Sequence, residues 1–303
     1  MTANSNPIFV IGSINTDMVA MTEVLPSPGE TVMSREFMMT AGGKGANQAV
    51  AAARMGGDVT MIGRLGNDVF AEQSIKRLKS ENINCEFITK DTEKASGVAL
   101  ISVDQNGENH IVVAPGANET LTKERLGSVL SQIPDNAIVM MQLEIPLESV
   151  VSVIEFCKKS DKKIILDPAP AKNLTPDFTK SLYMITPNET EATAMTGIKI
   201  KDLRDVKKAA IKLLGSGSQY VLITMGANGV YLASQNDEFE YITSPKVTTI
   251  DSTAAGDCFN GTLAVSLSQG LSVFEAAKKA CRAASISVTR KGAQDSMPFI
   301  NEL

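Results

Sequence analysis

The sequence predicts an α/β protein with a doubly wound, mostly parallel sheet, helices on both faces, and a small antiparallel β lid beside it. Short, fully apolar runs alternate with segments of helical length and helical apolar spacing. Strands that are apolar on both faces belong in a parallel sheet that is covered on both sides. Two early stretches break this rhythm with turn residues, which indicates antiparallel hairpins.

The strands of the main sheet are expected at five apolar runs. In order they are PIFVIGS (7–13), AIVMMQL (137–143), KKIILDP (162–168), LYMITPN (182–188) and YVLITMG (220–226). Segments with helical length and spacing lie between them, at residues 147–160, 188–197 and 205–217. The alternation of the two patterns is typical of a parallel sheet.

The lid is expected where hairpin turns interrupt strand-like sequence. Residues 26–29 read Pro-Ser-Pro-Gly, and Asn106-Gly107 forms a second turn signal. We expect one large globular domain over residues 1–303, with the lid formed by discontinuous segments at about 17–41 and 96–114.

Composition excludes several classes of protein. The chain is 43% hydrophobic and 21% charged, and no segment approaches the length of a membrane span. Its net charge is −5 and its basic residues are scattered, which argues against nucleic acid as the main partner. The N-terminus lacks a signal-peptide pattern, so the cytoplasm is the expected compartment.

The cysteine and histidine content narrows the chemistry further. The cysteines are far apart in sequence and form no CxxC pair, so we expect neither a zinc site nor disulfides. His110 is the single histidine, which rules out an HExxH site and leaves one candidate for any Ser-His-Asp triad. We interpret His110 as a structural residue of a strand or loop.

Polar residues follow several of the predicted strands, directly after the carboxyl end of each. Ligands of an open parallel sheet bind beyond the carboxyl ends of its strands, so these residues are expected along one edge. They are Asn15, Asp17, Glu144, Asn188, Glu189, Glu191, Thr224, Gly226 and the 251–257 loop.

The stretch IDSTAAGDCFNG, residues 250–261, is typical of an anion site. Its small residues let backbone N–H groups converge, and the helix that follows adds its positive end. Asp257 lies inside this site, although it is itself an anion.

A second glycine-rich loop, AGGKGANQ, precedes an alanine-rich helix. Gly42, Gly43 and Gly45 allow bare backbone to approach a small polar ligand, to which Lys44 or Asn47 can donate hydrogen bonds. The loop matches neither GxxxxGK[ST] nor GxGxxG, so a P-loop or dinucleotide fold is not expected. A tight loop before a closely packed helix is the alternative interpretation.

Seven segments together resemble the ribokinase-like carbohydrate kinase family. They are GSINTD, AGGKGANQAVAAARMGG, QLE, TPNETEA, TMGANGV, DSTAAGDCFNG and VTRKGAQDSMP, and they span residues from about 8 to 298. The resemblance implies a doubly wound α/β domain whose β lid also forms a homodimer interface. It also implies ATP-dependent phosphorylation of D-ribose at O5, which gives D-ribose 5-phosphate and ADP.

The resemblance assigns roles residue by residue. The sugar hydroxyls would be bound by Asn15, Asp17, Gly43, Lys44, Asn47 and Glu144. Asn188 and Glu191 match an NxxE motif that orders Mg²⁺ and the phosphates, while Thr224, Gly226, Gly229, Gly256 and Cys281 would line the ATP site. Cys258 replaces an expected threonine and Cys281 a larger polar residue, so nucleotide contacts can differ here.

The resemblance also resolves the role of Asp257. The N–H groups of Ala254, Ala255, Gly256 and Asp257 would stabilise the moving phosphoryl group, while the Asp257 carboxylate receives the proton of the sugar hydroxyl. A K⁺ cage would be formed by Asp251, Thr253, Ser287, Arg290, Gly292 and Ser296. The alternative for Asp251 is an ion pair with Arg290 or Lys291.

Two other functions stay open at this level. A kinase of the same fold can act on deoxyribose, another sugar or a nucleoside, because the resemblance does not extend to the pocket residues that lie between the motifs. A non-catalytic sensor of sugar or nucleotide is the other alternative. A sensor has no physical need for both a base and an anion site, which weighs against it.

Overall fold

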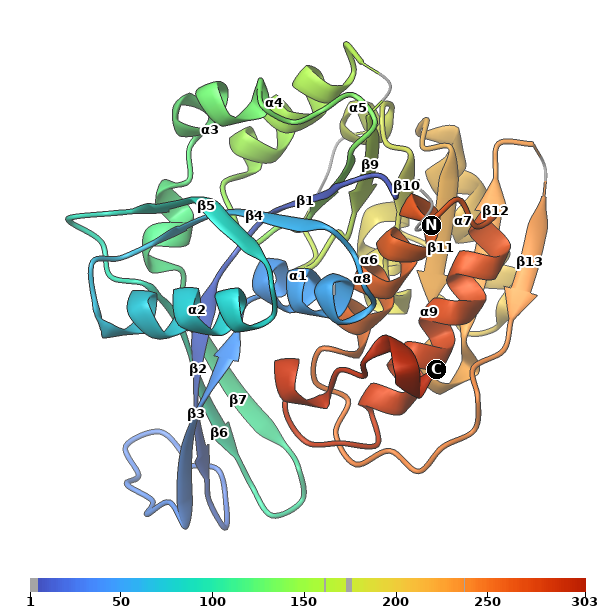
Figure 1. The fold of residues 1–303 in the computed structure, drawn as a ribbon. Helices are drawn as coiled ribbons and strands as arrows, with labels where there is room; N and C mark the ends of the chain where they lie inside the picture. Colours follow the sequence, from blue (N-terminus) through green and yellow to red (C-terminus); the bar gives the residue numbers. More distant parts are fainter. Residues whose placement is uncertain (1–4, 161, 173–175, 237) are drawn as a thin grey trace.

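The main sheet of the molecule has nine strands, of which seven run parallel (Figure 1). The computed structural model describes residues 5–160, 162–172, 176–236 and 238–303. The strand order is β13-β12-β11-β10-β9-β8-β1-β4-β5. The parallel strands are β1 (Ile8–Ile11), β4 (Val59–Leu65), β5 (Asn84–Lys90), β8 (Ile138–Met141), β9 (Lys163–Leu166), β10 (Met184–Ile185) and β11 (Tyr220–Thr224). An antiparallel hairpin of β12 (Val230–Ser234) and β13 (Phe239–Ile242) extends one edge.

Helices cover both faces of this sheet, as the sequence predicts. One hydrophobic cluster lies under α1 (Lys44–Arg54), α2 (Val69–Ser80), α8 (Ala255–Ser268) and α9 (Val273–Ser287). The other lies under α3 (Lys123–Leu130), α4 (Leu147–Cys157), α6 (Glu189–Thr196) and α7 (Leu203–Gly215), and α5 (Pro176–Thr179) is one turn long.

Strand β1 explains why the core has two halves. Its side chains alternate, so Ile8 and Val10 join the first cluster while Phe9 and Ile11 join the second. Burial of an isoleucine of this kind contributes roughly 1.5–3 kcal/mol, so a polar residue on either face of β1 would be costly. The prediction of an α/β fold with both faces covered is therefore confirmed.

The helix boundaries differ slightly from the sequence pattern. Helix α4 ends at Cys157, before the predicted end at residue 160. Helix α7 begins at Leu203, two residues before the predicted segment, because Asp202 caps it. The Asp202 carboxylate accepts hydrogen bonds from the backbone N–H groups of Arg204 and Asp205.

The lid is a separate sheet of four strands that projects away from the main sheet (Figure 1). Its strands are β2 (Asn15–Met21), β3 (Glu36–Gly42), β6 (Gly97–Val103) and β7 (Asn109–Ala114), in the order β3-β2-β6-β7. The two hairpins are antiparallel, and they join through a parallel pairing of β2 with β6. These strands overlap the two segments expected for the lid, and the division of the chain into domain and lid stays a prediction. His110 lies exposed in β7.

Candidate functional site

The glycine loop lies directly against the turn that follows β1. A Cβ atom added to Gly45 would lie 2.7 Å from the carbonyl carbon of Gly12, and one added to Gly43 would lie 2.6 Å from the backbone nitrogen of Asn15. Gly43 also has a φ of 87°, which disfavours any side chain. The close approach brings the start of α1 beside the start of β2.

Asn15 and Asp17 belong to lid strand β2, beside the start of α1. The Asp17 carboxylate packs on Gly42, whose added Cβ would lie 2.3 Å from either carboxylate oxygen. Burial, followed by the negative charges of Glu144 and Asp257, raises the pKa of Asp17 to about 6. Asn15 Oδ1 accepts a 2.7 Å hydrogen bond from Asn118 Nδ2. This bond fixes the Asn15 amide with its own NH₂ group directed away from Asn118.

Glu144 follows β8 and reaches the glycine loop. Its Oε2 accepts hydrogen bonds from Ser13 Oγ at 2.6 Å and from the backbone N–H of Lys44 at 3.1 Å. Ser13 and Asn118 are not among the site residues predicted from the sequence. Ser13 directly follows an apolar strand, which is the signal that could have found it, whereas no local pattern marks Asn118.

Lys44 lies in the field of several carboxylates. Burial by itself lowers the pKa of Lys44, but the surrounding negative charges outweigh it and hold that pKa above its ordinary value. The contributing groups, in order, are Asp257, Asp167, Glu144 and Glu191. Lys44 therefore faces both the residues expected at the sugar and the NxxE motif expected at the phosphates.

Asp167 is a further acidic residue that the sequence analysis missed. It follows β9 at the carboxyl edge, so the strand-end rule that identified Glu144 applies to it as well. Burial raises its pKa well above the ordinary value, and its carboxylate accepts a 2.8 Å hydrogen bond from Gln48 Nε2.

Asp257 lies in the first turn of α8 and is only 5% exposed. Asn47 Nδ2 donates to its Oδ2 at 3.0 Å, and Gln48 Nε2 donates to its Oδ1 at 3.1 Å. Burial raises the pKa of Asp257, while Lys44 and the two amides oppose the rise. The carboxylate is thus fixed in place and made more basic than an exposed aspartate, as general base catalysis requires.

The start of α8 supplies backbone donors next to this carboxylate. Ala254 has a φ of 58° and α8 begins at Ala255. The Ala255 N–H donates to the carbonyl of Ser252 at 3.2 Å. In the part of the chain that the structure describes, the N–H groups of Gly256 and Asp257 make no hydrogen bond, so they are free to receive an anion.

A cavity of about 470 Å³ opens beside Gly256. Its lining includes every residue expected at the nucleotide, namely Thr224, Gly226, Gly229, Gly256 and Cys281. Phe259, Val247 and Val288 supply apolar walls, which suit a planar base. Burial raises the pKa of Cys281 to about 12, so this thiol stays neutral. Cys258 is buried in the core cluster instead.

Asn188 and Glu191 form a reciprocal cap on α6. Asn188 Oδ1 accepts from the Glu191 N–H, and Glu191 Oε2 accepts from the Asn188 N–H, both at 2.8 Å. Glu191 is buried and its pKa is raised by burial. Among the residues that the structure describes, no cluster of three or more histidine, cysteine, aspartate or glutamate side chains forms a metal-binding group.

The residues expected at a K⁺ ion lie on two loops that contact each other. Asp251 Oδ2 accepts a 2.9 Å hydrogen bond from the Gly292 N–H, and its Oδ1 accepts from the Thr253 N–H. Ser287 and Ser296 are buried, whereas the Arg290 side chain pairs with Glu302. Arg290 is therefore engaged by Glu302 and not by Asp251, while the charge of Lys291 is among the causes that lower the pKa of Asp251, so the Lys291 form of the alternative stays open.

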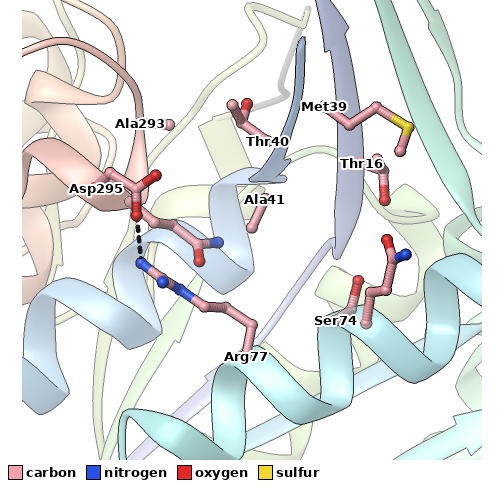
Figure 2. A pocket seen from close by; sticks show the side chains of 10 residues that line it. Thr16, Met39, Thr40, Ala41, Ser74, Arg77, Ala293 and Asp295 are labelled. Carbon is pink, nitrogen blue, oxygen red and sulfur yellow. Dashed lines mark hydrogen bonds and ion pairs between the residues drawn. The ribbon is translucent and has the colours of Figure 1, made fainter.

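A smaller cavity of about 230 Å³ lies between the base of the lid, α2 and the C-terminal loop (Figure 2). Arg77 crosses its floor to pair with Asp295 at 2.5 Å, and Thr16 and Met39 line it from the lid strands. Gln294 also lines it and donates from Nε2 to Asn47 Oδ1 at 3.2 Å.

Comparison with known proteins agrees with this geometry. Residues 5–300 match the pfkB family of carbohydrate kinases. The chain belongs to this family of carbohydrate kinases. The kinase is 39% identical to a ribokinase of Haemophilus influenzae over 97% of this chain and 95% of that protein. It is 36% identical to a deoxyribokinase of Salmonella typhi over 97% and 96% of the two chains.

A solved structure has the same fold. The Arabidopsis thaliana ribokinase complexed with ribose and ATP superposes on this kinase with a TM-score of 0.89, at 30% identity, over 98% of this chain and 97% of that chain. No helix in the described part of the kinase is long and apolar enough to cross a membrane. Cys157, Cys258 and Cys281 are buried free cysteines, and Cys85 is a half-buried one.

Proposed function

We propose that this kinase transfers the γ-phosphoryl group of ATP to O5 of D-ribose and releases D-ribose 5-phosphate and ADP. The observation that carries the proposal is the position of Asp257. Its buried carboxylate contacts Asn47 on the sugar side, while the adjacent Gly256 lines the 470 Å³ cavity. A sugar hydroxyl held between the two would lie next to both a base and a phosphate.

In this mechanism Asp257 accepts the proton of the O5 hydroxyl as O5 attacks the γ-phosphorus. The bond from phosphorus to the bridging oxygen breaks, and ADP leaves with the electron pair. The free N–H groups of Gly256 and Asp257 stabilise the charge on the phosphoryl oxygens. Lys44 provides a cation on the same side, because it interacts with both Asp257 and Glu191.

The acidic residues of the cleft also fit a magnesium ion. Asp167 and Glu191 offer hard oxygen donors, and Asn188 would act through water because its amide already caps α6. Burial disfavours the charged form of both carboxylates, so a cation near them would be stabilising. When bound with ATP, Mg²⁺ would neutralise phosphate charge.

Deoxyribose is a second candidate substrate. The deoxyribokinase of Salmonella typhi matches this chain nearly as well as the Haemophilus influenzae ribokinase does, so overall identity does not separate the two sugars. The test is ADP release with D-ribose, 2-deoxy-D-ribose, D-fructose and nucleosides. The highest kcat/KM with ribose supports the proposal, and a preference for any other acceptor contradicts it.

Asp17→Ala is expected to raise the KM for ribose more than the KM for ATP. The substitution leaves sugar hydroxyls without an acceptor, at a cost of about 1–3 kcal/mol for each unpaired group. In the parent protein the pKa of about 6 means that Asp17 loses its charge as the pH falls below 6, so the ribose KM should rise there. The variant should lack this rise. A higher ATP KM with an unchanged ribose KM would reverse the assignment of the two ends of the cleft.

We also propose that K⁺ occupies the cage of Asp251, Thr253, Ser287, Arg290, Gly292 and Ser296 oxygens. Hydrogen bonds from Thr253 and Gly292 outweigh burial and keep the pKa of Asp251 low, so its charge is available to a cation. Activity should rise when KCl replaces tetramethylammonium chloride at constant ionic strength, because the ion would hold the loop before α8. Equal ADP release in K⁺-free and K⁺-containing enzyme would contradict the cage.

A homodimer through the lid completes the proposal. Apolar side chains on one face of the lid sheet are exposed, among them Phe37 at 60%, Leu100 at 49% and Val112 at 63%. An exposed apolar patch of this kind is typical of a protein interface. Sedimentation should give a dimer for the parent protein and a monomer for Val112→Lys, whereas a monomeric parent at micromolar concentration would contradict this interface.

A further inference from the structure

The Asp257 carboxylate is the end point of two chains of side-chain amides. In one chain, Gln294 Nε2 donates to Asn47 Oδ1 at 3.2 Å and Asn47 Nδ2 donates to Asp257 at 3.0 Å. In the other, Gln142 Nε2 donates to Gln48 Oε1 at 2.7 Å, and Gln48 Nε2 donates both to Asp257 at 3.1 Å and to Asp167 at 2.8 Å. All four amides are buried.

The direction of both chains is set by hydrogen-bond chemistry. An ionised carboxylate only accepts, so the inner amides must turn their NH₂ groups toward Asp257 and their oxygens outward. Each outward oxygen then receives an N–H from an outer glutamine. A rotated inner amide would place its oxygen against the carboxylate and its NH₂ group against another donor.

The two outer glutamines, Gln142 and Gln294, are not fully hydrogen-bonded within the described part of the chain. Among the described residues, Gln142 Oε1 and Gln294 Oε1 are buried without a hydrogen-bond partner. Gln142 Oε1 lies against Gly12, where an added Cβ would come within 2.1 Å. Gln294 lines the 230 Å³ cavity of Figure 2. An unpaired buried acceptor is costly, so stability of the outer glutamines alone does not account for the arrangement.

We propose that Gln142 and Gln294 are positioning residues, which act through Gln48 and Asn47 to hold the Asp257 carboxylate ionised and oriented toward the sugar hydroxyl. Nothing in the proposed reaction requires them to touch the substrate. The inference rests on the proposed role of Asp257 as the base. Two segments would then control the basicity of Asp257: the C-terminal loop, through Gln294, and the segment directly after β8, through Gln142.

Other charges around Asp257 act together with the amides. Lys44 favours the ionised carboxylate, whereas Glu144 disfavours it, and Asp17, Asp167 and Glu191 also interact with Asp257. The outer glutamines carry no charge and contact none of these groups in a described hydrogen bond. Replacing them therefore changes the donors to Asp257 without removing a charge from the cleft.

The test is the pH dependence of kcat at saturating ribose and ATP, which reports the base in the bound complex. Gln294→Met and Gln142→Met keep side-chain length and remove the outer donor. Each should move the acid limb of kcat upward by about one pH unit, because an inner amide that has lost its outer donor is a weaker and less well oriented donor to Asp257, which disfavours the charged form. The double variant should move it further, and ATP affinity should stay within about twofold of the parent value.

Gln73→Met is the matched control, because Gln73 lines the same cavity as Gln294 but is exposed. Its acid limb should coincide with that of the parent. If Gln142→Met does not fold, Gln294→Met and Gln294→Glu still decide the question. An unmoved acid limb in folded Gln294 variants overturns the proposal, as does an equal shift in Gln73→Met. Asp257→Asn belongs in the same series: if it retains normal turnover, the base assignment itself fails.

Discussion

Asp257→Asn is expected to lower kcat by about 10²–10⁴-fold, the usual contribution of a general base. The substitution preserves the size of the side chain and one oxygen that can accept from Asn47 or Gln48. It removes the lone pair that takes the proton of the sugar hydroxyl. Ribose affinity should stay within about tenfold, since little ground-state binding is lost.

The measurement pairs single-turnover kinetics with ribose binding by calorimetry. Turnover near the parent value in a folded Asp257→Asn protein would eliminate this carboxylate as the base. A large loss of ribose affinity with an unchanged rate constant for the chemical step would instead make Asp257 a sugar ligand only.

Lys44→Met is expected to have the next largest effect, a fall in kcat of about 10²–10³-fold. Lys44 is the cation that the carboxylates of Asp257 and Asp167 share. Without it, phosphoryl transfer loses a positive charge that faces both the base and the NxxE motif.

The same substitution should make stability depend more strongly on pH. Loss of Lys44 lets the pKa values of Asp257 and Asp167, which burial already raises, rise further in the folded state. A carboxylate whose folded pKa lies above its unfolded pKa contributes stability at low pH that is lost as the pH rises through the folded value. The Tm deficit of Lys44→Met should therefore be larger at pH 8 than at pH 5.

Two controls accompany this variant. Lys44→Arg keeps the charge and should recover much of the Tm, while Lys246→Met removes a charge from the lining of the 470 Å³ cavity, which includes neither Asp257 nor Asp167. A Tm deficit for Lys44→Met that is independent of pH would show that its charge does not compensate the buried acids.

The central sheet could be predicted because its information is local. Apolar runs such as residues 138–141 carry the strand signal within a few positions, and helical spacing does the same for α4 and α7. Strands β4, β5, β12 and β13 lie outside the five predicted runs. The strands of the β12–β13 hairpin are short, and short strands take their identity from their neighbours.

The candidate site was predicted in part for the same reason. The strand-end rule identified Glu144, and it would have identified Asp167 if applied to every strand. Gln142 directly follows β8 and fits the same rule, whereas Asn118 and Gln294 carry no comparable signal. Asn118 and Asn15 are 103 positions apart, so their hydrogen bond depends on packing between the lid and the main sheet rather than on sequence spacing.

The amides around Asp257 also constrain when the site can assemble during synthesis. Asn47 and Gln48 precede Asp257 by 210 and 209 positions, and Gln294 follows Asn47 by 247. When only the N-terminal half of the chain has left the ribosome, Asn47 and Gln48 are present but their acceptor, Asp257, is not. Domains generally fold as units during synthesis. Asn47 and Gln48 of α1 can therefore complete their hydrogen bonds only after Asp257 and Gln294 have left the ribosome. A chain that terminates between residues 258 and 293 would therefore contain all the described strands and Asp257 but lack the Gln294 donor to Asn47.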